Sequence, residues 1–393
     1  MWPGAARRPQ TDARVAESVI YSGAVERFEI GGRLLSGGRE IAGSVVVEGD
    51  EIAGVIAGRP GVDDVDLLHD GYIAPGLCDL QVNGAGGHSA TGDQAGLNAL
   101  EARLLQAGVT SYLPSIITLP PDLRLAAIDR LAPRVASPRS PATGIHLEGP
   151  LLNPEMARVH DPDHMEDAVE GVPEGFDHPA VKLVTLAPEV PGGRGAERFL
   201  AGRGVTVALG HSAAGAEEAL AAFDAGARAV THLFNAMPPL HHRAPGLVGA
   251  ALADERVTPM VIADNVHVDP LVLALVERAA GERVVLVSDA TAAAGAPEGR
   301  YRLAGAPIER RGDVVVDAEG RLSGSALLLD RCARRWWEAT GCPPAEAWAA
   351  ASDRPAELVG LDHGLVPGVA ASLVLLSREL EVRRVMFRGE WVA

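Results

Sequence analysis

The sequence predicts an α/β protein built on a (β/α)8 barrel of the TIM type, with a small β-sandwich-like domain formed by both ends of the chain. In the middle of the chain, eight short apolar or β-branched runs alternate with Ala-, Leu- and Glu-rich stretches of helical spacing. Eight parallel strands are the number that closes a barrel. Both chain ends are rich in β-forming residues instead. The length of 393 residues suits one large barrel with one small accessory unit.

The small domain is predicted from two β-rich segments. Residues 44–57 have two such runs around Glu-Gly-Asp-Glu, which is typical of a hairpin, and residues 371–392 have the same pattern around a charged turn. We expect 19–70 and 361–393 to form this domain together, with the barrel at 71–360. Residues 1–18 are polar and contain Arg and Pro, and we expect them to be a disordered extension.

The barrel strands are expected at 73–82, 111–117, 144–147, 181–186, 205–209, 229–233, 259–263 and 284–288. Intervening helical patterns include 97–106, 217–223 and 271–279. The rival fold is an open doubly wound sheet, which would need a Gly-rich phosphate-binding turn after its first strand. The run that begins at Asn83, Asn-Gly-Ala-Gly-Gly, lacks the G-x-G-x-x-G spacing, and this favours the barrel.

Composition narrows the class of protein. A net charge of −17 disfavours nucleic acids and anionic membranes as partners. No apolar run is long enough to span a membrane, and the N-terminus has no signal-peptide pattern. The chain has three cysteines, Cys78, Cys332 and Cys342. An odd number with wide spacing argues against a disulfide framework. We therefore expect a cytoplasmic protein.

The informative pattern lies at the C-terminal ends of the predicted strands, where metal-ligand and acid–base residues follow the apolar runs. These residues are Asp79, Gln81, Asn83, His146, Glu148, His211, His232, Asp264, His267 and Asp289. In a barrel the strand ends meet on one face, which is where active sites of this fold lie. Residues far apart in the sequence are therefore predicted to share one site.

Glu148, His211 and His232 are the predicted metal ligands. One carboxylate and two imidazoles suit a divalent transition metal and leave a position for water. A single buried histidine would more often hydrogen-bond locally, but three ligands at strand ends favour one metal ion per chain. Zinc is the first expectation, and iron, cobalt and manganese also accept this ligand set.

Asp289 is the predicted catalytic base. It would take a proton from the attacking water, whose pKa the metal lowers to about 7, and return that proton to a leaving amine. Its alternative role is a hydrogen-bond partner of a ligand histidine.

Several motifs resemble one known family. Glu148 lies in His-Leu-Glu-Gly-Pro, His211 in Gly-His-Ser, His232 in Thr-His-Leu-Phe-Asn-Ala-Met and Asp289 in Ser-Asp-Ala-Thr. These are similar to motifs of the N-acetylglucosamine-6-phosphate deacetylases, members of the amidohydrolase superfamily. The resemblance runs in consistent order from about Val46 to the C-terminus. It implies hydrolysis of an N-acetyl amide, the metal and base roles above, and a homodimer.

The resemblance also implies substrate contacts. His160 would polarise the acetyl carbonyl. The matching substrate-binding positions are Val159, His160, Asn235, Ala236, Arg243, His267, Leu322, Ser323, Gly324 and Ser325. The phosphate would be held by Asn235, the backbone of Ala236, Arg243 and His267. The sugar or acetyl pocket would be lined by residues 322–325. Arg243 would reach the site of a neighbouring subunit.

Some positions differ from the superfamily pattern. The first strand has Gln-Val-Asn beginning at Gln81, in place of His-x-His, which favours a single metal that Gln81 could contact directly or through water. Lys182 begins its strand and is expected to be solvated rather than a metal bridge. Arg158, Ala244 and Asn265 replace other residues beside the pocket. Two alternatives stay open. One is a deacetylase of a different N-acyl amino sugar, which includes unphosphorylated sugars of a biosynthetic pathway. The other is a catalytically inactive metal-binding homologue.

Overall fold

The computed structural model describes residues 27–61 and 65–393. The predicted extension at 1–18, and the start of the predicted N-terminal part of the small domain, lie outside the described residues. Within the described ranges, no helix is both long and apolar enough to cross a membrane.

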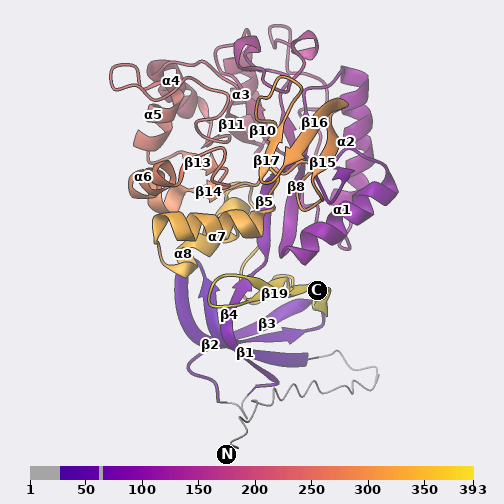
Figure 1. The fold of residues 1–393 in the computed structure, drawn as a ribbon, viewed down its shortest axis with the longest axis vertical. Coiled ribbons are helices and arrows are strands. Elements are labelled where there is room, and N and C mark those ends of the chain that lie inside the picture. Colours follow the sequence, from indigo (N-terminus) through magenta and orange to yellow (C-terminus); the bar gives the residue numbers. More distant parts are fainter. Residues whose placement is uncertain (1–26, 62–64) are drawn as a thin grey trace, which may run out of the picture.

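The predicted barrel is confirmed (Figure 1). Eight strands form one parallel sheet in the order β14-β13-β12-β11-β10-β9-β8-β5. Their bounds are β5 Leu77–Val82, β8 Val109–Ile117, β9 Ile145–Glu148, β10 Val181–Leu186, β11 Thr206–Leu209, β12 Ala229–Val230, β13 Thr258–Val261 and β14 Val285–Leu286. A parallel bridge between Val82 and Ala290 joins the two edges of the sheet. The strand ends are therefore gathered around one mouth.

Side chains alternate along these strands because successive residues of a strand point to opposite faces. One set fills the barrel interior, and this cluster includes Cys78, Leu80, Leu113, Leu183, Met260, Ile262 and Val285. The other set packs outward against the helices in a larger cluster. Because apolar side chains fill the barrel interior below the mouth, the polar side chains of a site can gather only at the strand ends.

The outer layer consists of helices. Their bounds are α1 Gln94–Gln106, α2 Pro121–Val135, α3 Gly193–Ala201, α4 Ala216–Ala225, α5 Gly246–Ala253, α6 Pro270–Ala280, α7 Leu329–Thr340, α8 Pro344–Ala349 and α9 Asp353–Leu358. Asp93 caps α1 through the backbone N–H of Gly96, and Asp269 caps α6. Between β9 and β10 there is no α-helix but a long loop with two 3-10 turns, η1 at Pro154–Met156 and η2 at Pro162–His164. This loop lies at the mouth and contains His160.

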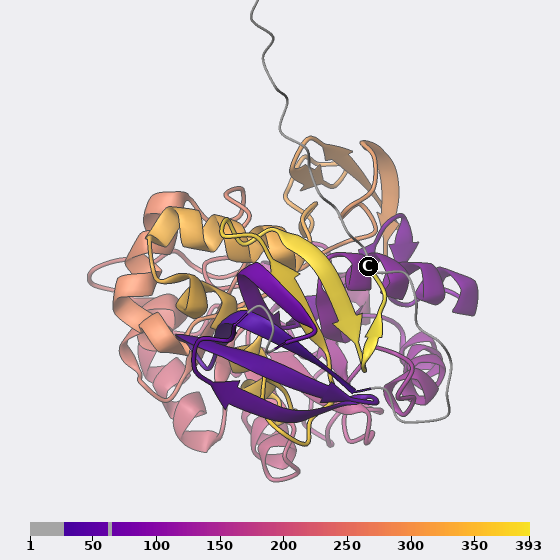
Figure 2. The same ribbon diagram turned by 90° about the horizontal axis from the view of Figure 1, so that it is seen from below.

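Both chain ends build a separate sheet, as predicted (Figure 2). It is one seven-stranded sheet in the order β20-β19-β18-β4-β1-β2-β3. The bounds are β1 Arg27–Ser36, β2 Arg39–Glu48, β3 Glu51–Ala57, β4 Leu67–Pro75, β18 Leu373–Leu376, β19 Val382–Phe387 and β20 Glu390–Trp391. Figure 2 shows the indigo N-terminal and yellow C-terminal strands side by side. The indole N–H of Trp348 donates to the carbonyl of Pro75 at 2.8 Å and joins the sheet to the barrel.

Two short strands, β6 at Gly84–Ala85 and β7 at His88–Ser89, follow β5. The sequence did not predict a further three-stranded sheet, β15 Gly299–Leu303, β16 Ala306–Arg311 and β17 Val314–Val316. Its apolar side chains Leu303, Ile308 and Val315 pack against Ile117 near the barrel mouth. This insertion places new residues over the site.

Candidate metal centre and active site

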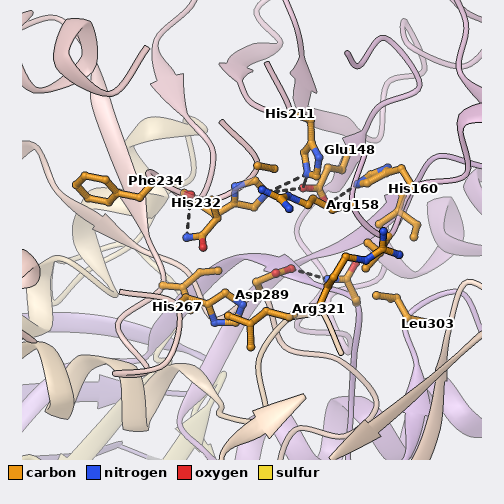
Figure 3. Close-up of a pocket in the computed structure, with 18 residues that line it drawn as sticks. Glu148, Arg158, His160, His211, His232, Phe234, His267, Asp289, Leu303 and Arg321 are labelled. Atoms are coloured by element: carbon orange, nitrogen blue, oxygen red, sulfur yellow. Dashed lines mark hydrogen bonds and ion pairs between the residues drawn. The ribbon is translucent and has the colours of Figure 1, made fainter. Parts of the chain in front are cut away.

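The three predicted metal ligands lie together at the barrel mouth (Figure 3): Glu148, His211 and His232. Their places at the ends of predicted strands had indicated this. Glu148 Oε1 lies 3.1 Å from His211 Nε2 and 3.0 Å from His232 Nε2, and the two nitrogens are 3.1 Å apart. All three side chains are buried. Within the described residues, this is the one group of histidine, cysteine and carboxylate side chains that could hold a metal ion.

The hydrogen bonding of His211 indicates that this group fits a cation. His211 Nδ1 lies 2.8 Å from the carbonyl oxygen of Met156, to which it can only donate. In the neutral ring, Nε2 therefore presents a lone pair to Glu148 and His232. Converging lone pairs and a carboxylate repel one another in a buried site unless a cation lies between them. The donor set of two imidazoles and one carboxylate is that of a catalytic zinc-like site.

Gln81 and Asn83, which the sequence analysis set against a His-x-His pair, lie at the C-terminal end of β5. Gln81 Nε2 donates to Glu148 Oε1 at 3.1 Å, so its amide orients a ligand. Gln81 Oε1 is buried and has no hydrogen-bond partner among the described residues. Asn83 Nδ2 donates to Asp289 Oδ1 at 2.7 Å. These amides support the carboxylates of the site rather than build a second metal position.

Asp289 lies in the pocket across from Glu148 and His211 (Figure 3). Desolvation in the enclosed site, together with the negative charge of Glu148, raises the pKa of Asp289 to about 7. A carboxyl group with a pKa near neutrality can both accept and return a proton. Asn83 fixes its orientation.

His160 has a defined tautomer. The backbone N–H of Thr118 donates to His160 Nδ1 at 3.2 Å, and the Thr118 hydroxyl lies 2.8 Å from the same nitrogen. Burial lowers the pKa of His160 to about 3, so the ring is neutral. Its proton is therefore on Nε2, which lies 4.0 Å from Glu148 Oε2 and has no hydrogen-bond partner among the described residues. The site thus contains an N–H donor beside the predicted metal ligands.

His267 is held by Asp264. His267 Nδ1 lies 2.7 Å from Asp264 Oδ2, which also accepts from the Ser325 hydroxyl at 3.1 Å. Burial alone would lower the pKa of His267, but the hydrogen bond and charge of Asp264, with the charge of Asp289, raise it above its usual value. The positively charged form of His267 is therefore more favoured in this pocket than in a free histidine.

The predicted residues surround one pocket of about 350 Å³. Those that line it are Glu148, Val159, His160, His211, His232, Asn235, Ala236, His267, Asp289, Leu322 and Gly324. Ser323 and Ser325 are buried and do not line the pocket, and Ser325 contacts Asp264 instead. Arg243 is exposed outside the pocket, with Nη1 2.8 Å from His242 Nε2. Arg243 therefore does not line the pocket of its own chain.

Backbone strain is concentrated at this site. Ten described residues other than glycine have a positive φ, and six of them line the pocket. The six are Arg158, His211, His232, Phe234, Ala236 and Asp289. Such conformations persist where surrounding contacts impose them, which is common at functional sites.

Sequence reasoning assigned no role to several pocket residues. Ile117, Phe234 and Ile262 come from strand ends or the turn after His232, while Leu303 and Arg321 come from the inserted sheet and its connection. Motif spacing could have placed Phe234, which lies inside the Thr-His-Leu-Phe-Asn-Ala-Met run. Leu303 and Arg321 had no comparable signal, because the insertion that positions them was not recognised.

Known proteins resemble this chain over most of its length. The amidohydrolase family model matches residues 72–392. An N-acetylgalactosamine-6-phosphate deacetylase from Escherichia coli O157:H7 is 39% identical over 336 residues, which cover 83% of this chain and 88% of that protein. An N-acetylglucosamine-6-phosphate deacetylase from Danio rerio is 38% identical over 340 residues, covering 81% of this chain and 84% of the relative.

Solved structures agree with this assignment. A mutant N-acetyl-D-glucosamine-6-phosphate deacetylase from Mycobacterium smegmatis, solved in complex with N-acetyl-D-glucosamine-6-phosphate, superimposes with a TM-score of 0.89 at 32% identity. The match covers 94% of this chain and 100% of that one. The chain therefore belongs to the amidohydrolase family and, within it, to the N-acetylglucosamine-6-phosphate deacetylases.

Proposed function

We propose that this protein removes the acetyl group from an N-acetylated hexosamine 6-phosphate, with N-acetylglucosamine 6-phosphate giving glucosamine 6-phosphate and acetate. One observation carries the proposal: a metal-ligand set, a carboxyl group with a pKa near 7 and a neutral N–H donor line the same pocket. Amide hydrolysis by an attacking water is accelerated by a metal that activates the water, a group that moves the proton and a donor to the developing oxyanion, and these residues can supply all three.

Glu148, His211 and His232 would hold one divalent ion, for which we propose zinc. When bound, such an ion supplies Lewis acidity to the attacking water and the acetyl carbonyl. Met156 fixes the His211 ring through Nδ1, and Gln81 orients Glu148, so the ligands are positioned in advance.

Asp289 would move the proton during hydrolysis. As a carboxylate it accepts a proton from the attacking water, and as a carboxylic acid it donates that proton to the amine nitrogen as the C–N bond breaks. Asn83 keeps its carboxylate facing the pocket throughout.

His160 would bind the acetyl oxygen. Its Nε2–H has no hydrogen-bond partner in the described parts of the chain and lies next to Glu148. Negative charge that develops on the acetyl oxygen in the transition state would strengthen this hydrogen bond, and this kind of stabilisation accelerates acyl transfer. Val159 packs against the inserted sheet beside it and would narrow the acetyl end of the pocket.

Asn235, Ala236 and His267 would bind the phosphorylated end of the sugar, with Leu322 and Gly324 lining the remaining wall. We propose a homodimer in which Arg243 reaches the site of the partner subunit, since it lies outside its own pocket. Sedimentation should then give a dimeric mass. A monomer with full activity at assay concentrations would contradict this arrangement.

The cytoplasm is the compartment we propose. Cys78, Cys332 and Cys342 are all buried free thiols, as expected for a protein of a reducing environment.

Acetate release tests the proposal. Purified protein loaded with zinc should release acetate from N-acetylglucosamine 6-phosphate, and Asp289→Asn should release it about 10²–10⁴-fold more slowly. The panel should include the unphosphorylated sugar and an N-acetylated amino acid. Release from none of these substrates would mean a catalytically inactive homologue, and preference for the neutral sugar would reject the phosphorylated substrate.

A second candidate substrate is N-acetylgalactosamine 6-phosphate, favoured by the 39% identity to the bacterial deacetylase named for it. The two sugars differ only in the configuration at C4. The ratio of kcat/KM values for the two phosphorylated epimers decides between them.

A further inference from the structure

One end of the pocket is apolar. Three aliphatic side chains that line it belong to one apolar cluster, although they come from three separate elements. Ile117 ends β8, Val159 lies in the loop after β9, and Leu303 ends β15 of the inserted sheet. Figure 3 shows Leu303 on the side of the pocket where His160 lies, away from His267. The apolar end is therefore opposite the end that would bind the phosphate.

This apolar end adjoins the groups that would act on the acyl carbon. Ile117 is paired in register with Glu148 on the neighbouring strand. In-register residues of parallel strands point to the same face of the sheet, so the Ile117 side chain lies beside the ligand carboxylate. The next residue, Thr118, donates its backbone N–H to His160 Nδ1 at 3.2 Å. An acyl carbonyl that accepts from the Nε2–H of His160 therefore has its alkyl group next to this apolar wall.

The inserted sheet holds its part of the wall in place. Leu303 precedes a two-residue hairpin turn, residues 304 and 305, whose φ angles are 45° and 87°. Positive φ at both positions is typical of the tight turns that fix hairpin register. Behind Leu303 lies the buried side chain of Ile308. Arg310 Nη1 donates to the carbonyl of Ala293 at 3.0 Å and ties the sheet to the segment that follows β14.

We propose that Leu303, with Ile117 and Val159, closes the acyl end of the pocket and makes this enzyme select acetyl groups over longer acyl chains. The proposal rests on the proposed function and adds the residue that selects the acyl group. Leu303 and Ile117 are only 7% and 6% exposed, whereas Arg158, on the same side, is exposed and forms the rim. A longer acyl chain would have to displace buried side chains, which is unfavourable in a packed cluster.

A series of acylated substrates tests this. The substrates are glucosamine 6-phosphates that carry N-acetyl, N-propanoyl or N-butanoyl groups. One methylene in an apolar pocket changes kcat/KM by about 10–200-fold, and wild type should prefer acetyl to propanoyl by a factor in this range. In Leu303→Ala, the kcat/KM ratio of butanoyl to acetyl substrate should rise by at least about tenfold. A ratio measured on one preparation does not depend on the fraction of active protein, so misfolding cannot produce this gain.

Three further variants complete the test. Ile308→Ala removes an apolar side chain from the same cluster but does not touch the pocket lining, so the ratio should stay at the wild-type value. Leu303→Met conserves volume and should also keep it. Leu303→Val is the milder truncation, which should raise the propanoyl ratio even if Leu303→Ala folds poorly. Wild-type ratios in both truncations, or an equal rise in Ile308→Ala, would overturn the proposal.

A binding measurement separates this proposal from the proposed function. It uses zinc-loaded Asp289→Asn, in which turnover is slow, with and without Leu303→Ala. Calorimetry should show tighter binding of N-butanoylglucosamine 6-phosphate to the double variant and equal binding of glucosamine 6-phosphate, which has no acyl group. If wild type hydrolysed none of the substrates but this difference persisted, the proposed reaction would be wrong and the acyl end right. If acetate were released and the difference were absent, only the role of Leu303 would be rejected.

Discussion

Asp264 and His267 form a buried pair at the wall of the pocket, with Asp264 Oδ2 2.7 Å from His267 Nδ1. Asp264 Oδ1 also accepts the backbone N–H groups of Val266 and His267 at 2.9 and 2.8 Å. The carboxylate therefore fixes both the ring and the turn that presents it. Burial alone would raise the pKa of Asp264, but these hydrogen bonds and the charge of His267 lower it.

This pair makes stability depend on pH in a defined direction. Because the pKa of His267 is raised on folding, its protonation stabilises the folded protein fully below the usual histidine pKa of about 6.5. This stabilisation is lost as pH rises through the pKa of His267 in the folded protein. Because the pKa of Asp264 is lowered on folding, its ionisation stabilises the folded protein fully above the usual aspartate pKa of about 3.9. This stabilisation is lost as pH falls through the pKa of Asp264 in the folded protein. The ion pair thus stabilises most between about pH 4 and about pH 6.5.

Asp264→Asn should therefore lower the free energy of unfolding by about 3–5 kcal/mol at pH 5.5, because it leaves a buried imidazolium without its partner. The difference from wild type should narrow as pH rises towards 9. Urea denaturation of both proteins across this range measures it. A difference that stayed constant with pH would show that the mutation acts through packing rather than through the charge of His267.

His211→Ala should lose metal and activity together. Wild type should contain one divalent ion per chain, since Gln81 and Asn83 replace the histidines of a second position. Removing one of three protein ligands leaves too few donors to hold the ion at micromolar metal concentrations. Elemental analysis after dialysis checks both statements, with His69→Gln in the small domain as a control that should keep its metal. Two ions per chain at full occupancy would contradict the single-metal site.

Asp289→Asn should keep the fold and the metal but lose most of the rate. The amide oxygen can still accept the hydrogen bond of Asn83, so the geometry is retained while proton transfer is lost. General acid–base catalysis typically contributes about 10²–10⁴-fold, and kcat should fall by that factor. Steady-state kinetics with metal analysis on the same sample measure it. Near-full turnover in Asp289→Asn would mean that another residue is the catalytic base.

His160→Ala should lower kcat by about 10²–10³-fold with little change in metal content, the usual cost of removing one donor to a developing oxyanion. His160→Gln should retain more activity, because its amide N–H can take the place of Nε2–H. This ranking distinguishes hydrogen-bond donation from a mainly structural role. If the two variants were equally impaired, donation from this position would not be the function of His160.

The site residues at strand ends could be predicted from the sequence because a parallel barrel brings its strand ends together, regardless of the conformation of the connecting loops. Glu148 is the last residue of β9, and His211, His232 and Asp289 lie two or three residues beyond the ends of β11, β12 and β14. The barrel then brings these strand ends to one mouth. The hairpin around Glu48 and Glu51 was equally local, since both strands and their turn are adjacent in the sequence.

Other features depend on contacts that no local pattern encodes. The Nε2–H tautomer of His160 follows from Thr118, which lies just after β8, whereas His160 is in the loop after β9. The sequence allowed Gln81 to contact the metal or its water, but it did not indicate that the Gln81 amide also donates to Glu148. The inserted sheet at 299–316 alternates weakly because much of it is exposed, so its strands had no clear hydrophobic period.

The sheet built from both chain ends has a consequence for synthesis on the ribosome. Strand β4 pairs in parallel with β1 and, on its other side, antiparallel with β18, so that Ile73 faces Leu375. Until the last residues leave the ribosome, β4 has an unpaired edge, and apolar residues such as Ile30 and Ile73 lack the cover that Leu373 and Met386 later provide. An open edge of this kind recruits other strands and promotes aggregation. Nascent and C-terminally truncated chains should therefore be the forms that need chaperones, even though their barrel residues are complete.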